Sequence, residues 1–224
     1  MEWHSNAELL ALIRNELYTA AIGDVCDQIG LRNQFLPASL RPLGCSPVPL
    51  LAGRAMPVLE ITISDEPDPR QPFGLMLEAL DALQQDELYV AAGVAPAFAL
   101  FGELMSIAAM RRGAAGAVCD GYVRDTERIL ALGFPVYCRG SYGRDQRYRG
   151  IVREYRIPVD IGGVHINPGE MIVGDADGLI AIPRAAEAEV FTRALSAARQ
   201  EKLARSALEQ GMSANEAFSR FGVL

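Results

Sequence analysis

Apolar residues recur along this chain with helical spacing in some stretches and form short continuous runs in others. Residues 5–17 place leucines and an isoleucine on one helical face, and Ser5 followed by Glu8 has the spacing of an N-terminal capping box. Thr19 is the expected cap of a second helix. The stretches that share the helical spacing are residues 19–29, 74–83, 104–112, 126–132 and 184–209.

Short runs rich in Val, Ile and other apolar residues indicate strands between these helices. The expected strands are residues 53–64, 87–92, 114–119 and 134–139, and three short β runs are expected within residues 157–183. Ser213 with Glu216 forms a second capping box near the C-terminus. This alternation predicts an α/β fold, and because no linker divides residues 1–224, we expect a single domain.

Composition narrows the classes of partner. Half of the 224 residues are hydrophobic, and the net charge is −7. Binding to nucleic acid or to an anionic membrane needs clustered Lys and Arg, which an acidic chain does not favour. The first ten residues lack the features of a signal peptide, and the longest uncharged run, residues 88–102, is too short to span a bilayer. We therefore expect a cytoplasmic protein without nucleic-acid or membrane partners.

Cysteine and histidine usage argues against several kinds of site. Cys26, Cys45, Cys119 and Cys138 form no CxxC pair, which favours reduced thiols in the core. The chain has two histidines, too few for a zinc site or a histidine-based triad, and we interpret His165 as a structural residue of a strand. Neither a Walker A sequence nor a GxGxxG fingerprint occurs.

Candidate chemistry is concentrated in residues 93–125. Gly102-Glu103 and Arg124-Asp125 each follow an apolar run, and each opens a predicted helix. A chain that runs turn, helix, turn, strand, turn brings its two turns to the same end of a layer. We therefore expect Glu103, Arg124 and Asp125 to share a site.

These residue types suit the binding of an anion and a hard cation. The first helical turn, from Gly102 to Met105, offers backbone N–H groups to a carboxylate or phosphate. Arg124 provides a positive fork for an oxyanion, while Asp125 provides a hard oxygen ligand that suits Mg²⁺ or Mn²⁺ better than zinc. The alternative is that Glu103 and Asp125 merely favour helix N-termini and that Arg124 pairs with one of them across the surface. Residue chemistry alone leaves both interpretations open.

A resemblance bears on this choice. The run GELMSIAAMRRGAAGAVCDGYVRD, followed by GFPVYCRG, IPVDIGGVHINPGE and VGDADGLIAIP, resembles the RraA-like family, which includes 4-hydroxy-4-methyl-2-oxoglutarate/4-carboxy-4-hydroxy-2-oxoadipate aldolases. The similarity covers about residues 15–205. Aldolase members carry an acid, twenty intervening residues and then Arg-Asp, and Glu103 followed by residues 104–123 and Arg124-Asp125 reproduces this spacing.

The resemblance implies a fold and an activity. The fold would be a compact three-layer β/β/α sandwich related to the phosphohistidine swivelling domains, assembled as a homotrimer or hexamer with sites between subunits. The activity would be that of a class II pyruvate aldolase, a metal-dependent lyase that cleaves a 4-hydroxy-2-oxo acid by a retro-aldol reaction. Oxaloacetate decarboxylation would be a side activity, because it passes through the same enolate.

The resemblance also implies roles for individual residues. By position, Asp125 would bind Mg²⁺ or Mn²⁺ directly, and Glu103 would hold a metal-bound water. Arg124 would face the 2-oxo oxygen of the small oxo-acid substrate. The substrate carboxylate would be bound by the backbone amides of the first helical turn, which belong to Gly102, Glu103, Leu104 and Met105.

Some assignments stay open at this point. In the family, a neighbouring subunit's C-terminal helix brings an acid near the metal, and Glu201 is either this residue or a solvent-exposed glutamate. Residues 65–72 form a proline-rich loop that is either a connection or a lid. Residues 140–156 are rich in Arg and Tyr, which favours a subunit interface over an RNA-binding strip. The alternative to an enzyme is the family's name-giving branch, a non-catalytic regulator that binds a ribonuclease and generally lacks the acid corresponding to Glu103.

Overall fold

The computed structural model describes residues 2–44, 48–95 and 97–223. The helices are α1 (Asn6–Glu16), α2 (Thr19–Gln28), α3 (Met76–Asp81), α4 (Glu103–Arg111), α5 (Thr126–Leu132), α6 (Glu187–Glu209) and α7 (Ala214–Phe221). The strands are β1 (Arg41–Pro42), β2 (Leu51–Thr62), β3 (Glu87–Ala92), β4 (Ala99–Phe101), β5 (Gly116–Val123), β6 (Val136–Ser141), β7 (Gly150–Tyr155), β8 (Val159–Ile161), β9 (Val164–Ile166), β10 (Met171–Asp175) and β11 (Gly178–Ile182).

The helices and strands expected from the sequence are present, with bounds that differ by a few residues. One expectation about the strands was wrong. Residues 157–183 contain four strands and not three, because β8 and β9 form a separate hairpin before β10 and β11. The segment of residues 140–156 contributes a sheet strand, β7, which pairs with β2, while Arg153 and Glu154 of this strand are exposed. The subunit interface expected for this segment stays a prediction.

Nine described strands form one mixed sheet around the long strand β2. The order is β1-β6-β5-β3-β2-β10-β11, with β4 beside β5 and β7 beside β2. The pairs among β2, β3, β5 and β6 are parallel, whereas β2 pairs antiparallel with both β10 and β7. Because β2 has 12 residues, its first part pairs with β10 and its last part with β7. The strand therefore joins the parallel and antiparallel parts of the sheet.

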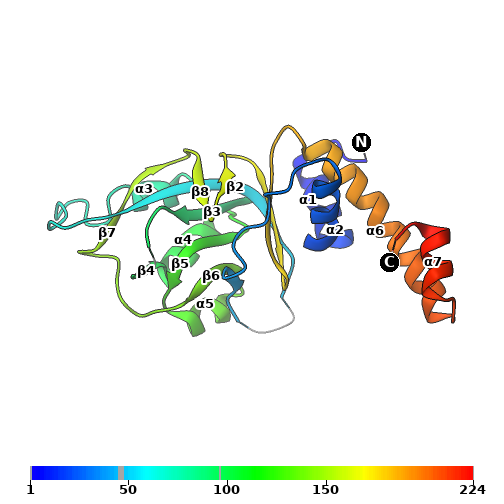
Figure 1. Cartoon of the computed structure of the whole chain (residues 1–224). Helices are drawn as coiled ribbons and strands as arrows, with labels where there is room; N and C mark the ends of the chain where they lie inside the picture. Colours follow the sequence, from blue (N-terminus) through cyan, green and yellow to red (C-terminus); the bar gives the residue numbers. More distant parts are fainter. Residues whose placement is uncertain (1, 45–47, 96, 224) are drawn as a thin grey trace.

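The elements stack in layers, as Figure 1 shows. Helices α3, α4 and α5 cover one face of the parallel strands over a core that includes Met56, Tyr89 and Phe101. The opposite face, with Leu88 and Val118, packs against β10, β11 and the β8–β9 hairpin. The terminal helices α1, α2 and α6 cover the outer side of β10 and β11. The predicted α/β fold with β/β/α layers is confirmed, and these terminal helices add a further layer.

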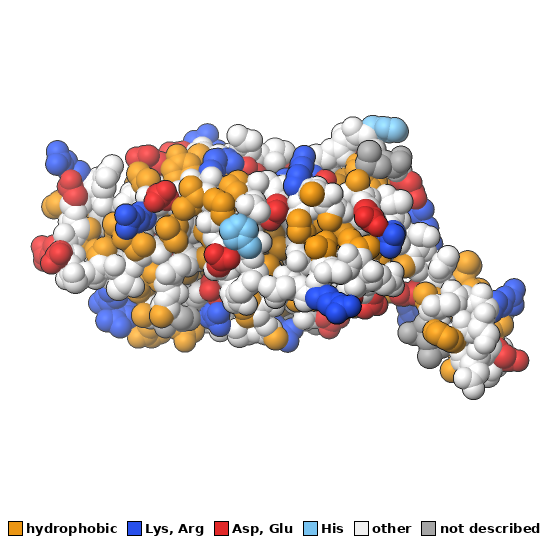
Figure 2. Space-filling view, turned by 45° about the horizontal axis from the view of Figure 1, so that its top comes forward, with side chains coloured by type: hydrophobic (Ala, Val, Ile, Leu, Met, Phe, Trp, Pro, Cys, Tyr) orange, Lys and Arg blue, Asp and Glu red, His pale blue; other side chains and the backbone are white. Residues whose placement is uncertain are grey.

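The C-terminal helices extend away from the sheet. Figure 1 shows that the end of α6 and all of α7 project from the body, and Figure 2 shows them as a separate lobe. The predicted capping box is present, because Ser213 and Glu216 exchange side-chain and backbone hydrogen bonds. Helix α7 buries Ala217, while Phe218 is exposed. Among the residues that the structure describes, we find no helix that combines the length and the apolar character needed to cross a membrane.

Two predicted helix caps differ from expectation. The Ser5 side chain accepts a hydrogen bond from the Glu8 amide as expected, but the Glu8 carboxylate accepts from the amide of His4 and not from that of Ser5. Thr19 is not a cap, because it lies within α2 and donates both its amide and its hydroxyl to Asp175, each at 2.7 Å. A carboxylate is a stronger hydrogen-bond acceptor than a hydroxyl, so Asp175, the last residue of β10, binds the N-terminus of α2 in place of a cap from Thr19.

The thiols behave as core residues. Cys26, Cys119 and Cys138 are buried and free, which confirms the prediction for these three, while Cys45 lies outside the described residues. Burial raises the pKa of the Cys26 thiol to about 11. His165 is exposed on β9, where its Nδ1 lies 3.1 Å from a carboxylate oxygen of Asp160. None of these side chains lines the pocket described below.

The hydrogen bonds of Asp175 should make a measurable contribution to stability, because they join the start of α2 to β10 of the sheet. Asp175→Ala should lower the free energy of unfolding by about 1–3 kcal/mol, because it removes the acceptor of three hydrogen bonds, including one from the Asp177 amide. Asp177→Ala, at an exposed side chain of the same turn, should change it by less than about 0.5 kcal/mol. Urea unfolding followed by circular dichroism measures the free energy of unfolding of both variants. Equal effects of the two substitutions would contradict a stabilising role of the Asp175 hydrogen bonds.

Candidate active site

The two turns identified in the sequence, Gly102-Glu103 and Arg124-Asp125, form two corners of the chain. These corners meet because β4 and β5 are parallel neighbours. Phe101, the last residue of β4, is in register with Val123, the last residue of β5. The amide of Arg124 donates to the carbonyl of Phe101 at 3.0 Å. Helices α4 and α5 therefore begin side by side at the same edge of the sheet, with Gly102 and Asp125 as their N-cap residues.

Asp125 caps the neighbouring helix instead of its own. Its backbone has φ 59° and ψ 34°, in the left-handed region that Asp tolerates better than most residues, and its side chain makes no cap bond to α5. Its Oδ2 instead accepts from the Glu103 amide of α4 at 3.2 Å. A Cβ at position 102 would lie 2.9 Å from this oxygen and 3.3 Å from Cγ of Arg124. A larger residue at position 102 would therefore displace the side chains of Asp125 and Arg124 from these positions.

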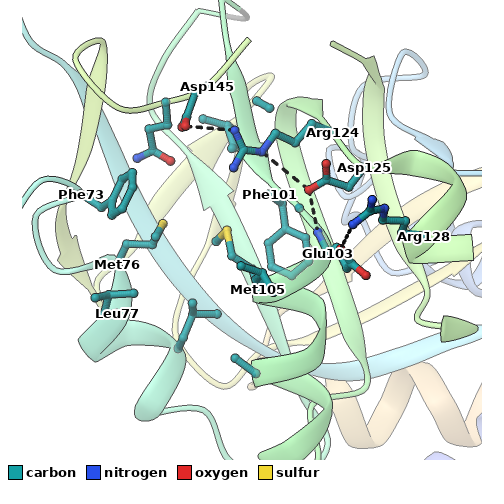
Figure 3. Close-up of a pocket in the computed structure, with 17 residues that line it drawn as sticks. Phe73, Met76, Leu77, Phe101, Glu103, Met105, Arg124, Asp125, Arg128 and Asp145 are labelled. Atoms are coloured by element: carbon teal, nitrogen blue, oxygen red, sulfur yellow. Dashed lines mark hydrogen bonds and ion pairs between the residues drawn. The ribbon is translucent and has the colours of Figure 1, made fainter. Parts of the chain in front are cut away.

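Arg124 lies between two carboxylates. Its Nε is 3.7 Å from Oδ2 of Asp125, and its Nη1 is 3.0 Å from Oδ2 of Asp145 in the loop after β6. Figure 3 shows the guanidinium group reaching into the pocket between these partners. Partial burial acts to raise the pKa of Asp145, but the Arg147 amide and the Arg124 guanidinium outweigh it and bring this pKa below its ordinary value. The Asp145 carboxylate is thus an ionised anchor for Arg124.

Glu103 makes a second charged pair beside the first. Its Oε2 lies 3.0 Å from Nη1 of Arg128, which is on the first turn of α5. The hydrogen bond and the negative charge of Glu103, together with the charge of Asp125, raise the pKa of Arg128. Figure 3 shows these three side chains together at one end of the pocket. The two helix starts are therefore joined by side chains as well as by the backbone contact.

A single pocket of about 510 Å³ includes every site residue predicted from the sequence. These residues are Gly102, Glu103, Leu104, Met105, Arg124 and Asp125. The structure thus brings the two corners together, while the chemical roles of these residues stay predictions. Arg124 does lie near Asp125, as the surface-pair alternative supposed, but the contact lines a pocket and includes a third residue, Asp145.

Sequence reasoning missed other residues of the pocket. Asp145 and Gln146 come from the segment of residues 140–156, and no local pattern connects them to Arg124. Arg128 could have been found, because it follows Asp125 by three residues on a predicted helix face. Glu201 is on α6, outside the pocket lining, so its role in a neighbouring subunit stays a prediction. Residues 65–72 also lie outside it, and only the adjacent Phe73 contributes to the lining.

The acids of the pocket suit a cation that keeps much of its water. No group of three His, Cys, Asp or Glu side chains arranged to hold a metal occurs in residues 2–44, 48–95 and 97–223. Mg²⁺ needs only one or two protein carboxylates, since waters and substrate oxygens complete its coordination. Asp125 offers Oδ1, which lies outside the contacts of Oδ2 described above, and Glu103 stands next to it. The donor set therefore fits Mg²⁺ or Mn²⁺ and not zinc.

A buried acid supports the pocket wall from behind. Glu60 of β2 is fully buried, and its Oε2 accepts from the side-chain amide of Gln146 at 2.7 Å. Within the part of the chain that the structure describes, its Oε1 has no hydrogen-bond partner, and neither has the buried hydroxyl of Tyr89. Burial raises the pKa of Glu60 to about 8, against the opposing effect of the Gln146 hydrogen bond. The acid is therefore protonated at neutral pH and holds Gln146 beside Asp145.

The raised pKa of Glu60 predicts how stability depends on pH. The unfolded chain releases this proton near the ordinary value of 4.5, whereas the folded protein keeps it until about pH 8. Between these values the folded state binds more protons, so the free energy of unfolding should fall as pH rises, by about 2–4 kcal/mol from pH 5 to pH 8. Glu60→Gln retains the size and shape of the side chain but removes its ionisable carboxyl group, so it should remove this decline in the free energy of unfolding. Urea unfolding at both pH values tests it, and an unchanged slope in the variant would refute the assignment.

Comparisons with known proteins agree with the fold. The sequence matches the RraA-like family (Aldolase/RraA) over residues 19–181. A protein of Halalkalibacterium halodurans named "Putative 4-hydroxy-4-methyl-2-oxoglutarate aldolase" is 35% identical over 120 residues, which are 54% of this chain and 57% of that protein. The chain spans about half the length of most curated relatives that it matches. Several other relatives carry the same name.

Solved structures show the same architecture. One chain, from a structure titled as novel cellulases from gut-associated microbes, is 31% identical and has a TM-score of 0.81 over 89% of this chain and 87% of that chain. Streptomyces coelicolor RraAS2, titled an unusual member of the RNase ES inhibitor RraA protein family, is 23% identical with a TM-score of 0.78 over 91% and 98% of the two chains. Because one fold hosts several functions, these titles do not assign an activity. The family match and the shared architecture do establish that this chain belongs to the RraA-like family.

Proposed function

We propose that this protein is a class II pyruvate aldolase. It would cleave a 4-hydroxy-2-oxo acid, such as 4-hydroxy-4-methyl-2-oxoglutarate, to pyruvate and a second oxo compound, with Mg²⁺ or Mn²⁺ as cofactor. The observation that carries the proposal is the contact of the Glu103 amide with Asp125, which brings two acids and Arg124 into one pocket. The names of the curated relatives support the same class of reaction.

The start of α4 provides the binding site for the substrate carboxylate. Amides in the first turn of a helix have no intrahelical acceptor, and the helix dipole adds positive potential there. The Glu103 amide already donates to Asp125, which leaves those of Leu104 and Met105 for the substrate. Anion binding at such a turn needs no side chain. The 2-oxo group next to the bound carboxylate then faces Arg124.

Cleavage requires removal of one proton and stabilisation of one negative charge. A water held by the Glu103 carboxylate takes the proton of the C4 hydroxyl, and the C4 oxygen forms a carbonyl as the C3–C4 bond breaks. The electron pair of that bond moves into the pyruvate enolate, whose oxygen gains negative charge beside Arg124. Protonation of C3 gives pyruvate. A divalent cation on Asp125 would supply further positive charge to the carboxylate and 2-oxo oxygens.

Asp145 prepares Arg124 for this role. The salt bridge at 3.0 Å fixes the guanidinium group before substrate arrives, so that little reorganisation is needed when the enolate forms. The same arrangement would stabilise the enolate produced by decarboxylation of oxaloacetate. We further propose that the protein acts in the cytoplasm as a homotrimer or hexamer, in which Glu201 of a neighbouring subunit could approach the site.

The proposal predicts the effect of two substitutions on turnover. Asp125→Asn retains a residue that tolerates the left-handed backbone but weakens cation binding, and it should abolish measurable activity. Arg124→Ala should lower kcat about 10²–10³-fold, because it removes the group that faces the enolate oxygen. Arg153→Ala, at an exposed residue of β7 outside the pocket, is the matched control and should retain full activity.

Pyruvate release coupled to lactate dehydrogenase measures these variants with added Mg²⁺ or Mn²⁺ and with EDTA. Activity that persists in EDTA would count against the metal, and wild-type turnover in Arg124→Ala would count against the proposed role of the arginine. A protein that releases no pyruvate from any 4-hydroxy-2-oxo acid, yet retains a ribonuclease in a binding assay, would favour the regulator of the family's other branch.

A further inference from the structure

The pocket has two chemically different ends. Glu103, Arg124 and Asp125 lie at one end, where the proposed chemistry takes place, and Asp145 lies between Arg124 and Phe73 in the view of Figure 3. The other end is formed by α3 and the residues just before it, opposite the first turns of α4, and Figure 3 shows this separation. Its apolar lining residues are Phe73, Met76, Leu77, Leu80, Met105 and Ala108.

The pocket is larger than the reacting part of the substrate requires. Its volume of about 510 Å³ falls in the range of sites that enclose drug-sized ligands, whereas pyruvate has only six heavy atoms. If the pyruvyl part binds as proposed, between the start of α4 and Arg124, the substituent at C4 would extend toward Met76 and Phe73 on the other side of the pocket. Contacts with the apolar end therefore determine which substituent binds well.

The described side chains that this chain contributes to the apolar end include no cation that could pair with a second carboxylate. The cationic side chains among the described lining residues are Arg124 and Arg128, and both belong to the charged end. Arg124 pairs with Asp145, and Arg128 pairs with Glu103. A carboxylate placed against Phe73 and Met76 would lose its water without gaining a cation, whereas a hydrocarbon group there would gain from leaving water.

The side chains of this end also suit hydrocarbon groups of different shape. The side chains of Met76 and Met105 are flexible and can fill irregular spaces, and Phe73 offers an aromatic face. Leu77 is 59% exposed at the rim of the pocket, so it meets the outer part of a longer substituent.

We infer that the preferred substrate is a 4-hydroxy-2-oxo acid with an alkyl or aryl group on C4 in place of the carboxylate that 4-hydroxy-4-methyl-2-oxoglutarate carries there, which makes the latter a poorer substrate. This inference rests on the proposed aldolase function and names its substrate class. The reaction remains balanced, since the C3–C4 bond breaks, the C4 hydroxyl becomes the carbonyl of an apolar aldehyde or ketone, and the C3 carbon of pyruvate receives a proton. No oxidant or further reactant takes part.

Two substrates of matched shape test the inference. In 4-hydroxy-6-methyl-2-oxoheptanoate, C4 carries an isobutyl group, and in 4-hydroxy-2-oxoadipate it carries a carboxymethyl group of similar shape. Both release pyruvate, together with 3-methylbutanal or 3-oxopropanoate. The coupled pyruvate assay should give a kcat/KM at least about tenfold higher for the isobutyl substrate.

A substitution at the rim should reverse this preference. Leu77→Arg places a cation at the apolar end, so kcat/KM should rise for 4-hydroxy-2-oxoadipate and fall for the isobutyl substrate. Because the Leu77 side chain is mostly exposed, the substitution should leave the fold intact, and circular dichroism checks this. Met110→Arg adds the same charge at a 41% exposed position of α4 outside the pocket, and it should leave the ratio of the two kcat/KM values unchanged.

The outcomes separate the two proposals. Pyruvate release from both substrates with equal or better use of 4-hydroxy-2-oxoadipate would overturn the inference and leave the aldolase function standing. No pyruvate from either substrate, or from 4-hydroxy-4-methyl-2-oxoglutarate, would overturn both. A preference for the isobutyl substrate that Leu77→Arg reverses and Met110→Arg retains would support the inference.

Discussion

The hydrogen bond from the Glu103 amide to the Asp125 carboxylate depends on a space that only glycine at position 102 leaves open. Without this space the Asp125 carboxylate would be displaced from the Glu103 amide, and Arg124, whose Cγ also lies close to position 102, would have to move as well. The left-handed backbone of Asp125 is the second requirement, because it directs the carboxylate toward α4. The charged end of the pocket thus follows from two unusual backbone positions supported by the register of β4 and β5.

Charge pairing then fixes the side chains that the backbone has brought together. Arg124 lies between Asp125 and Asp145, while Glu103 holds Arg128. Each group is partly exposed, so these pairs add little to stability, but they restrict the orientation of long side chains. The wall behind them depends on Glu60, whose neutral carboxyl group holds Gln146 in the interior. Orientation, more than stability, is what these contacts provide.

The sequence predicted the local features of this arrangement better than the distant ones. The helix starts at Gly102 and Asp125 could be found because apolar runs precede them and the helical pattern follows. Asp145 could not be found, since its partner is fixed only when the loop after β6 passes the pocket. Thr19 was misjudged for the same reason, because the acceptor that satisfies it, Asp175, belongs to a strand turn far along the chain. Sequence patterns indicate interactions between residues that are close along the chain, whereas interactions between distant residues depend on the folded arrangement.

The close spacing of the two corners in the sequence also bears on how the protein folds. The hydrogen bond between residues 103 and 125 closes a loop of only 22 residues, whereas the bond between Thr19 and Asp175 joins positions 156 residues apart. Loop-closure entropy rises with loop length, and contacts of short range are therefore made at lower cost. The segment from β4 to α5 is accordingly the part of the chain that can reach its native arrangement before the termini are joined.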